Sequence, residues 1–216
     1  MNTDIAIVIP VYNEAEVIRQ VLEENRLSQK FTTIVVDDGS GDDSFVQASL
    51  YASLALRHKV NRGKGAAVKT GIMAANLLES DIVVTMDGDG QHDPGDIEAL
   101  VAPILKDEAD VVLGSRTLNR TEMPVIKKIA NFIGNLFTWL FYGIWVSDSQ
   151  SGFRAYSKYA ALIIDTKADK YEYDSKVIRE IKTNRLKFAE VPVQTRYTEY
   201  SKAKKQKQGF VNGIVT

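Results

Sequence analysis

Short runs of apolar and β-branched residues alternate with helical patterns through the first 115 residues, and this order restricts the chain to few folds. The patterns predict strands at residues 5–12, 32–36, 56–60, 81–86 and 109–113, and helices at 14–27, 42–56, 65–78 and 94–105. The strand runs are apolar almost throughout, as in strands buried on both faces of a sheet. Strands that alternate with helices in this way pair in parallel. The sequence therefore predicts an α/β fold with a Rossmann-like, mostly parallel central sheet and flanking helices.

Composition and charge limit the classes of function. The chain has 216 residues, of which 25% are charged and 44% hydrophobic, as is ordinary for a folded domain. The formal net charge of −1 gives no reason to expect nucleic acid as a partner. The chain contains no cysteine, which excludes disulfides and thiolate metal sites and fits a cytoplasmic protein. The first residues lack the basic and apolar regions of a secretory signal.

The second half of the chain has a different character. Residues 129–146 form a run of 18 residues without a charge that contains both tryptophans, Trp139 and Trp145. Asparagines and glycines interrupt this run, so we predict amphipathic helices that lie on a membrane face, with an ordinary buried helix as the alternative. A polar loop at 147–154, helices near 156–164 and 172–183, a strand at 186–197 and a lysine-rich tail after residue 200 complete the predicted order. No repeat or linker divides the chain, which predicts one domain over residues 1–216.

An apolar strand delivers two carboxylates, Asp87 and Asp89, into a glycine-rich turn. Hard divalent cations take oxygen ligands, and Mg²⁺ in particular is held by one or two carboxylates together with substrate phosphates. The turn therefore predicts a Mg²⁺ or Mn²⁺ site that receives a nucleotide diphosphate. A solvated turn is the plain alternative. An EF-hand loop is disfavoured because His92 occupies the position that requires glycine and a strand precedes the loop.

Two further polar motifs follow strands in the first half. Asp37 and Asp38 open an Asp-Asp-Gly-Ser segment that can bind a base or a ribose hydroxyl, or simply cap a turn. Residues 61–65 place Lys64 between two glycines before a helix, which suits a diphosphate. Neither a Walker loop nor the Gly-x-Gly-x-x-Gly pattern is present, so a tight loop with a solvated lysine is the alternative.

The polar residues after position 113 point to a second anion. Arg116 ends the last predicted strand of the first half and is a candidate bidentate phosphate ligand. In the polar loop, Gln150 and Arg154 either reach a substrate or satisfy backbone groups of the loop. The histidines, His58 and His92, have neither zinc-like nor triad spacing, and no Gly-x-Ser-x-Gly elbow is present, so a serine hydrolase is disfavoured.

Taken in their order along the chain, these motifs resemble those of family 2 glycosyltransferases with a GT-A fold, and within that family the polyprenyl-phosphate (dolichyl-phosphate) sugar transferases. Residues 148–154 and 190–193 extend the resemblance almost to the C-terminus. The motifs that carry it are Ile9-Pro10-Val11-Tyr12-Asn13-Glu14, Val36-Asp37-Asp38-Gly39-Ser40, Asn61-Arg62-Gly63-Lys64-Gly65, Asp87-Gly88-Asp89-Gly90-Gln91-His92-Asp93-Pro94 and Gly114-Ser115-Arg116.

The resemblance implies a role for each matching residue. The residues expected to bind the donor are Pro10, Tyr12 and Glu14 at the base and ribose, Asp38 at the base, and Lys64, Asp87, Gly88 and Asp89 beyond them. Mg²⁺ or Mn²⁺ is expected to lie among Asp87, Asp89 and Gln91. The acceptor is expected to meet Arg116, Gln150 and Arg154, and catalysis is expected to involve Asp89, Arg116 and Asp148.

The implied reaction moves a sugar, with inversion, from a nucleotide-diphosphate sugar to a polyprenyl phosphate at the cytoplasmic face of a membrane. A UDP-sugar is favoured as the donor over GDP-mannose. Residues 1–120 would bind the donor, and residues 121–216 would face the acceptor and the membrane surface. Many members of the family continue into C-terminal transmembrane helices, whereas this sequence ends soon after its basic stretch. A homo-oligomer is left open.

Three other functions fit parts of the pattern. A phosphate monoester is mostly dianionic near pH 7 and needs no strong base, but a saccharide hydroxyl as acceptor would require one, with Asp148, Glu172 and Asp174 as candidates. A nucleotidyltransferase also uses acidic strand ends and Mg²⁺, although it usually opens with a glycine-rich basic loop. A sugar-nucleotide-binding module without activity is the non-catalytic alternative.

Overall fold

The computed structural model describes residues 3–27, 31–118, 135–136, 139–170 and 172–196. These residues form a seven-stranded sheet in the order β3-β2-β1-β4-β6-β5-β7. Every strand pairs in parallel except β6, which is antiparallel to both of its neighbours, β4 and β5. The strands are β1 (Ile5–Val11), β2 (Phe31–Asp37), β3 (Leu54–Arg57), β4 (Ile82–Thr85), β5 (Val111–Ser115), β6 (Arg154–Ser157) and β7 (Phe188–Pro192). The predicted mostly parallel α/β sheet is confirmed.

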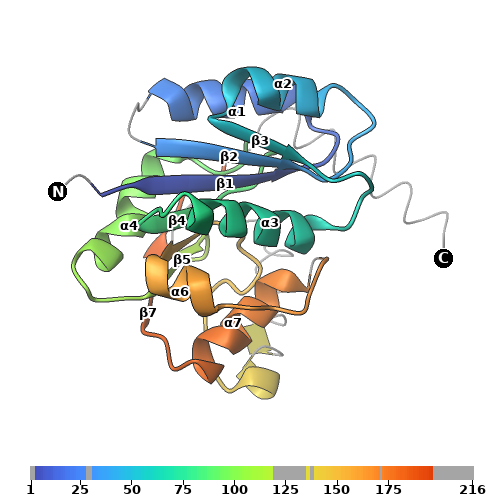
Figure 1. Cartoon of the computed structure of the whole chain (residues 1–216). Helices are drawn as coiled ribbons and strands as arrows, with labels where there is room; N and C mark the ends of the chain where they lie inside the picture. Colours follow the sequence, from blue (N-terminus) through green and yellow to red (C-terminus); the bar gives the residue numbers. More distant parts are fainter. Residues whose placement is uncertain (1–2, 28–30, 119–134, 137–138, 171, 197–216) are drawn as a thin grey trace.

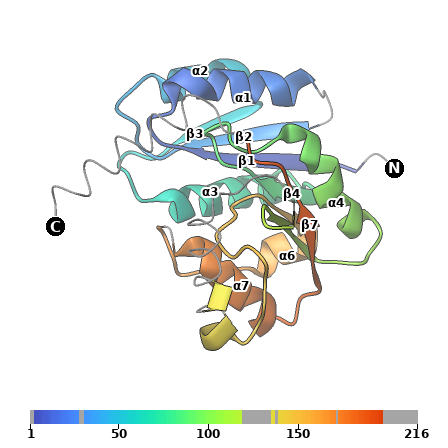
Figure 2. The same ribbon diagram turned by 180° about the vertical axis from the view of Figure 1, so that it is seen from behind.

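Helices cover both faces of the sheet (Figures 1 and 2). One face packs against α1 (Ala15–Leu27), α2 (Ser44–Tyr51) and α4 (Ile97–Leu105), the last preceded by the single 3₁₀ turn η1 (Pro94–Asp96). The other face packs against α3 (Lys64–Leu77), α6 (Lys158–Ile163) and α7 (Tyr173–Thr183). Because both faces are covered, β1 and β4 are buried along almost their whole length, which explains their unbroken apolar sequences.

Topology brings the polar motifs to one edge of the sheet. The parallel strands β1, β2, β4 and β5 all end there, and each is followed by one of the motifs identified in the sequence. Strand β6 runs the other way, so its first residue, Arg154, lies at the same edge and brings the preceding polar loop with it. Ligands bind at this edge in open α/β sheets.

Some predicted boundaries were wrong, and the partner strand explains most of the differences. Helix α2 ends at Tyr51, and β3 pairs with β2 only from Leu54 to Arg57, because β2 itself ends at Asp37. Strand β7 stops at Pro192, where its partner β5 ends at Ser115. The strand β6 was not predicted, and part of it was assigned to a helix near 156–164. Its four residues show no hydrophobic periodicity. They form a strand because they pair with β4 on one side and β5 on the other.

The predicted membrane-facing segment is only partly described. Of the run 129–146, residues 129–134 and 137–138 lie outside the described residues, as does the lysine-rich tail beyond residue 196. Among the helices that the structure describes, none combines the length and the apolar character needed to cross a bilayer. Residues 139–142 are helical, and Trp139, Leu140 and Phe141 are exposed.

Candidate active site

The acidic turn after β4 lies directly against the end of β1. A Cβ atom on Gly88 would come within 2.7 Å of Val11 Cγ1, so the turn packs this closely only with glycine at that position. The carboxylate of Asp89 accepts hydrogen bonds from the backbone N–H of Gln91 at 3.0 Å and from its side-chain Nε2 at 2.6 Å. The side chains of Asp87, Asp89 and Gln91 are all partly exposed, so the turn presents oxygen ligands at the surface of the sheet edge.

Lys64 is the cation nearest to the turn among the ion pairs of the described residues. Its Nζ lies 2.8 Å from Asp87 Oδ1 and 3.3 Å from Asp174 Oδ2, and so links the first turn of α3 to the acidic turn and to α7. Burial by itself would raise the pKa of Asp87, but the Lys64 ammonium, with help from Arg116, lowers that pKa to about 2. Burial likewise opposes the charge of Lys64, yet Asp87 and Asp174 raise its pKa above the ordinary value. Asp87 is therefore a carboxylate whenever a metal ion or a diphosphate arrives.

His92 is buried and contacts the backbone of the acidic turn. Its Nδ1 accepts a hydrogen bond from the backbone N–H of Asp87 at 3.2 Å, and its ring stacks on Phe153 with centroids 4.7 Å apart. Burial lowers the pKa of His92, against the opposing effect of the Asp87 and Asp89 carboxylates. The neutral ring has a free lone pair at Nδ1, which is what the N–H of Asp87 requires.

Of the residues predicted to bind the nucleotide, one tyrosine is exposed and the others are buried or partly buried. Tyr12 directly follows β1 and is 46% exposed, whereas Glu14 is buried and Pro10 is partly buried. Asp38 is buried, and its two oxygens accept hydrogen bonds from the backbone N–H groups of Arg62 and Gly63 at 3.0 and 2.7 Å. In this structure Asp38 thus holds the loop that leads into α3.

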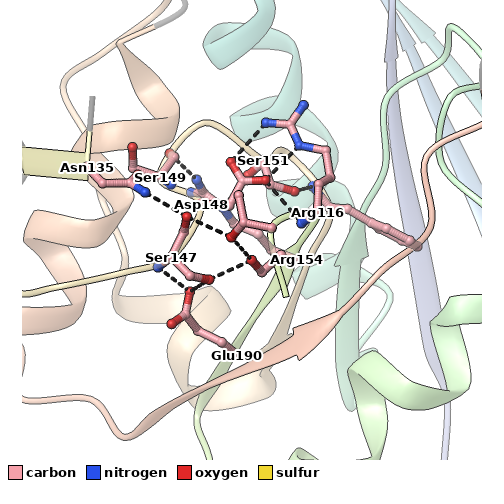
Figure 3. A network of polar contacts seen from close by, with 11 residues as sticks. Arg116, Asn135, Ser147, Asp148, Ser149, Ser151, Arg154 and Glu190 are labelled. Carbon is pink, nitrogen blue, oxygen red and sulfur yellow. Dashed lines mark hydrogen bonds and ion pairs between the residues drawn. The ribbon is translucent and has the colours of Figure 1, made fainter. Parts of the chain in front are cut away.

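Arg116 and Asp148 form a bidentate ion pair (Figure 3). Arg116 Nε and Nη2 donate to the two carboxylate oxygens at 2.7 and 2.9 Å, and the backbone N–H of Arg116 donates to the same carboxylate at 3.2 Å. The Asp148 side chain is fully buried, while that of Arg116 is 30% exposed. Asp148 therefore fixes the direction of an arginine that still reaches the surface.

The loop that carries Asp148 is itself held by side chains from distant parts of the chain (Figure 3). Asn135 donates to the carbonyl of Ser147 at 2.6 Å and accepts from the backbone N–H of Ser149 at 3.0 Å. Glu190 Oε1, from β7, accepts from the backbone N–H and the hydroxyl of Ser147 at 2.8 and 2.7 Å. These contacts make the loop a rigid support, which the arginine needs if it is to meet a phosphate in a fixed geometry.

The sequence left two roles open for Arg154, contact with a substrate and stabilisation of the loop backbone, and the structure shows the second. The residue is 1% exposed, and its guanidinium donates to the carbonyl oxygens of Ser149, Ser151 and Asp174 at 3.2, 2.9 and 2.9 Å. Gln150, in contrast, is exposed on the same loop. Arg154 stabilises the loop from inside, and Gln150 is the member of the pair that faces outward.

The donor set of the acidic turn fits a hard divalent cation. Asp87 and Asp89 supply carboxylate oxygens and Gln91 an amide oxygen, which are ligands of Mg²⁺ and Mn²⁺. Within the described residues no three His, Cys, Asp or Glu side chains gather closely enough to hold a metal ion by themselves. A cation at this turn would therefore take its remaining ligands from water and from the phosphates of a bound nucleotide, as Mg²⁺ commonly does.

Comparison with known proteins agrees with this geometry. A sequence model described as "Glycosyl transferase family 2" matches residues 6–162. The chain belongs to this family. A relative, the UDP-N-acetylglucosamine–dolichyl-phosphate N-acetylglucosaminyltransferase of Methanococcus voltae, is 37% identical over 93% of this chain and 88% of its own length. The undecaprenyl-phosphate mannosyltransferase of Micrococcus luteus is 30% identical over 86% of this chain and 81% of its own length.

The fold is that of the GT-A glycosyltransferases. Glucosyl-3-phosphoglycerate synthase from Mycobacterium tuberculosis superposes with a TM-score of 0.70 at 22% identity, covering 94% of this chain and 75% of that chain. That protein was solved in complex with Mn²⁺, UDP-glucose and phosphoglyceric acid. The predicted GT-A fold and the family are thus confirmed.

Sequence reasoning missed several residues that build the site. Asn135 and Glu190 hold the Ser147–Ser149 backbone, and His92 and Phe153 support the acidic turn. A glutamate in an otherwise apolar strand was a visible signal for Glu190. For Asn135 the only signal was a polar residue within an apolar run, which is too common to assign a role.

Proposed function

We propose that this family 2 glycosyltransferase moves a sugar, with inversion, from a nucleotide-diphosphate sugar to the phosphate of a polyprenyl lipid. The observation that carries the proposal is the pairing of two sites at one sheet edge. One is an acidic turn suited to a metal ion and a diphosphate, and the other is Arg116, an anion ligand held by buried Asp148. The turn follows β4 and Arg116 follows β5, and only β6 lies between these two strands at that edge. Two phosphate-bearing substrates would therefore meet there.

The residues of the turn have separate tasks in this reaction. Asp87 and Asp89, with Gln91, would hold Mg²⁺ or Mn²⁺, which offsets the negative charge that builds on the departing diphosphate. Lys64, at the first residue of α3, adds a positive charge and a helix N-terminus on the donor side. The ring of Tyr12, which is exposed, would stack on the nucleotide base.

The ion pairs of two candidate bases favour a phosphate as the acceptor. A hydroxyl acceptor needs a general base, and Asp148, Asp174 and Glu172 were the candidates. Asp148 is fully buried and engaged by Arg116, and Asp174 is engaged by Lys64. Each of these two carboxylates already holds a cation, whereas the phosphate monoester is itself an anionic nucleophile near pH 7 and needs no base.

Relatives and neighbours support the choice of substrates. The Methanococcus voltae relative is named for UDP-N-acetylglucosamine and dolichyl phosphate, and the Micrococcus luteus relative for undecaprenyl phosphate. The structural neighbour from Mycobacterium tuberculosis was solved with UDP-glucose. These names favour a UDP-sugar donor, with GDP-mannose as the alternative. In this proposal residues 1–120 bind the donor, and residues 121–216 face the acceptor.

An exposed aromatic surface supports attachment to a membrane, at its cytoplasmic face in this proposal. Trp139, Leu140, Phe141 and Trp145 are all exposed. A shallow hollow of about 440 Å³ beside them is lined by Phe141, Tyr142, Arg179, Lys182 and Thr183. Aromatic side chains next to basic ones suit the headgroup layer of a bilayer with anionic lipids. Sedimentation with vesicles containing phosphatidylglycerol should pull down the protein, and a Trp139→Ser/Phe141→Ser variant should remain in solution.

The test of the function is a screen of donors against acceptors with Mg²⁺ and with Mn²⁺. UDP-sugars and GDP-mannose are each offered with a short polyprenyl phosphate and with a free saccharide. Release of nucleoside diphosphate with the polyprenyl phosphate, and an inverted anomer by NMR, would support the proposal. Release with the saccharide alone would indicate a hydroxyl acceptor, release of pyrophosphate a nucleotidyltransferase, and binding without turnover an inactive module.

A further inference from the structure

Lys64 lies between two carboxylates that are 87 positions apart in the chain, and only one of them belongs to the acidic turn. Its Nζ is 2.8 Å from Asp87 Oδ1 and 3.3 Å from Asp174 Oδ2. Asp174 stands in the first turn of α7, and its side chain is only 12% exposed. The lysine thus covers an oxygen of a carboxylate that the proposed function assigns to the metal ion.

A divalent cation at the turn would share the Asp87 carboxylate with the Lys64 ammonium and would lie close to it. Their charges repel, and this repulsion is strong in a partly buried site where water screens poorly. When the metal binds, Lys64 releases Asp87, and a second carboxylate beside it keeps the largely buried ammonium paired before the diphosphate is in place. Asp174 is already within 3.3 Å of Nζ, so rotation about the last bonds of the lysine side chain completes the exchange.

We propose that Lys64 is the resident counter-ion of Asp87 in the ligand-free protein, and that Asp174 is a positioning residue that takes over Lys64 when a divalent cation binds with the nucleotide diphosphate. This inference rests on the proposed metal site at Asp87 and Asp89. It assigns a role to Asp174 that differs from that of a general base.

The space around Lys64 is consistent with this exchange. Gly152 faces the ion pair, and a Cβ atom there would lie 2.6 Å from Lys64 Nζ and 3.0 Å from Asp87 Oδ1. The absence of a side chain at this position leaves room for the lysine on Asp87. Asp174 is also flanked by Arg154, whose Nη2 lies 3.8 Å from Asp174 Oδ1, so its carboxylate does not depend on Lys64 alone for charge compensation.

The exchange predicts opposite effects for two substitutions. In Asp174→Asn, Lys64 loses its second anionic partner and stays on Asp87, so Mn²⁺ binding should weaken by about 10-fold, within the range of measured couplings between neighbouring charges. In Lys64→Met, no ammonium lies on Asp87, so binding of Mn²⁺ alone should become several-fold tighter. Asp174→Glu restores the carboxylate and should bind Mn²⁺ within about 2-fold of the wild type.

The measurement is the dissociation constant of Mn²⁺, followed by the electron paramagnetic resonance of the free ion, with UDP and without it. No acceptor or sugar is needed, and each constant is compared with the thermal unfolding curve of the same variant. The deciding comparison is made in the Lys64→Met background, where Asp174→Asn should have no further effect. An equal loss in both backgrounds would mean that Asp174 acts only through its own charge, and would overturn the proposal.

The remaining outcomes separate this inference from the proposed function. If Asp89→Asn leaves Mn²⁺ binding unchanged, the metal site itself is misplaced. If Asp89→Asn weakens binding but Asp174→Asn and Lys64→Met do not change it, the metal site stands and the exchange of Lys64 between Asp87 and Asp174 fails. Should Asp174→Asn not fold, Asp174→Ser replaces it in both backgrounds, and Lys64→Met must still tighten binding of Mn²⁺ alone.

Discussion

Replacing Arg116 by methionine should destabilise the protein more than replacing Asp148 by asparagine, although the two side chains form one ion pair. The difference follows from burial, because the Asp148 side chain is fully buried and that of Arg116 is 30% exposed. Without the arginine, a buried carboxylate loses its cation. Without the carboxylate charge, the arginine can turn towards water.

The magnitudes follow from the contacts. Arg116→Met removes hydrogen bonds of 2.7 and 2.9 Å and, within the described part of the chain, leaves the backbone N–H at 3.2 Å as the donor to the carboxylate, which should cost about 3–5 kcal/mol. Asp148→Asn keeps the shape of the side chain and one acceptor oxygen, and should cost about 1–3 kcal/mol. The double variant should cost less than the sum of the two, with a coupling of at least about 1 kcal/mol.

Urea unfolding followed by tryptophan fluorescence measures these free energies, since Trp139 and Trp145 are the only tryptophans. Asp169→Asn is the matched control: its partner Lys69 lies at 2.5 Å, but the aspartate side chain is 46% exposed, so the cost should stay below about 1 kcal/mol. Additive effects, or a larger loss for Asp148→Asn than for Arg116→Met, would refute the account.

The same variants distinguish support from catalysis. If Asp148 only holds Arg116, Asp148→Asn should raise the KM for the acceptor phosphate and leave the shape of the pH–rate profile unchanged. A general base at this position would instead lose about 10²–10⁴-fold in kcat with little change in stability.

Three further predictions concern the acidic turn and the core. Asp89→Asn should abolish turnover even at saturating Mn²⁺, and near-normal release of nucleotide would remove Asp89 from the metal site. The pKa of Asp87, lowered to about 2 in the folded protein, gives stability that is present above about pH 4 and is lost as the pH falls towards 2. Lys64→Met should therefore flatten the fall in unfolding free energy between pH 5 and 3, and an unchanged slope would contradict the pairing. Gly71→Ala should destabilise the protein by about 1–3 kcal/mol, against the usual helix preference for alanine, because its Cβ would overlap the side chain of Val8 in β1. Gly41→Ala, with nothing within 4 Å, is the control and should change the melting temperature little.

Local sequence patterns were sufficient for the order of elements in the first half. The apolar runs of β1, β2 and β4 are unbroken because these strands are buried on both faces. The acidic turn was visible in the sequence as two aspartates directly after the β4 run. These features depend on neighbours in the chain, so a single sequence reveals them. The short strand β6 does not, because only its place between β4 and β5 makes those four residues a strand.

The partners of the charged side chains were decided by the tertiary structure. The sequence by itself drew attention to Asp87, Lys64, Arg116 and Asp148, because they stand in segments that resemble motifs of the family. It did not show that Lys64 spans Asp87 and Asp174, nor that Asp148 is buried beneath Arg116. These ion pairs form between residues that the fold of the sheet brings to one edge. The separation of two residues along the chain does not indicate which carboxylate lies nearest to which cation.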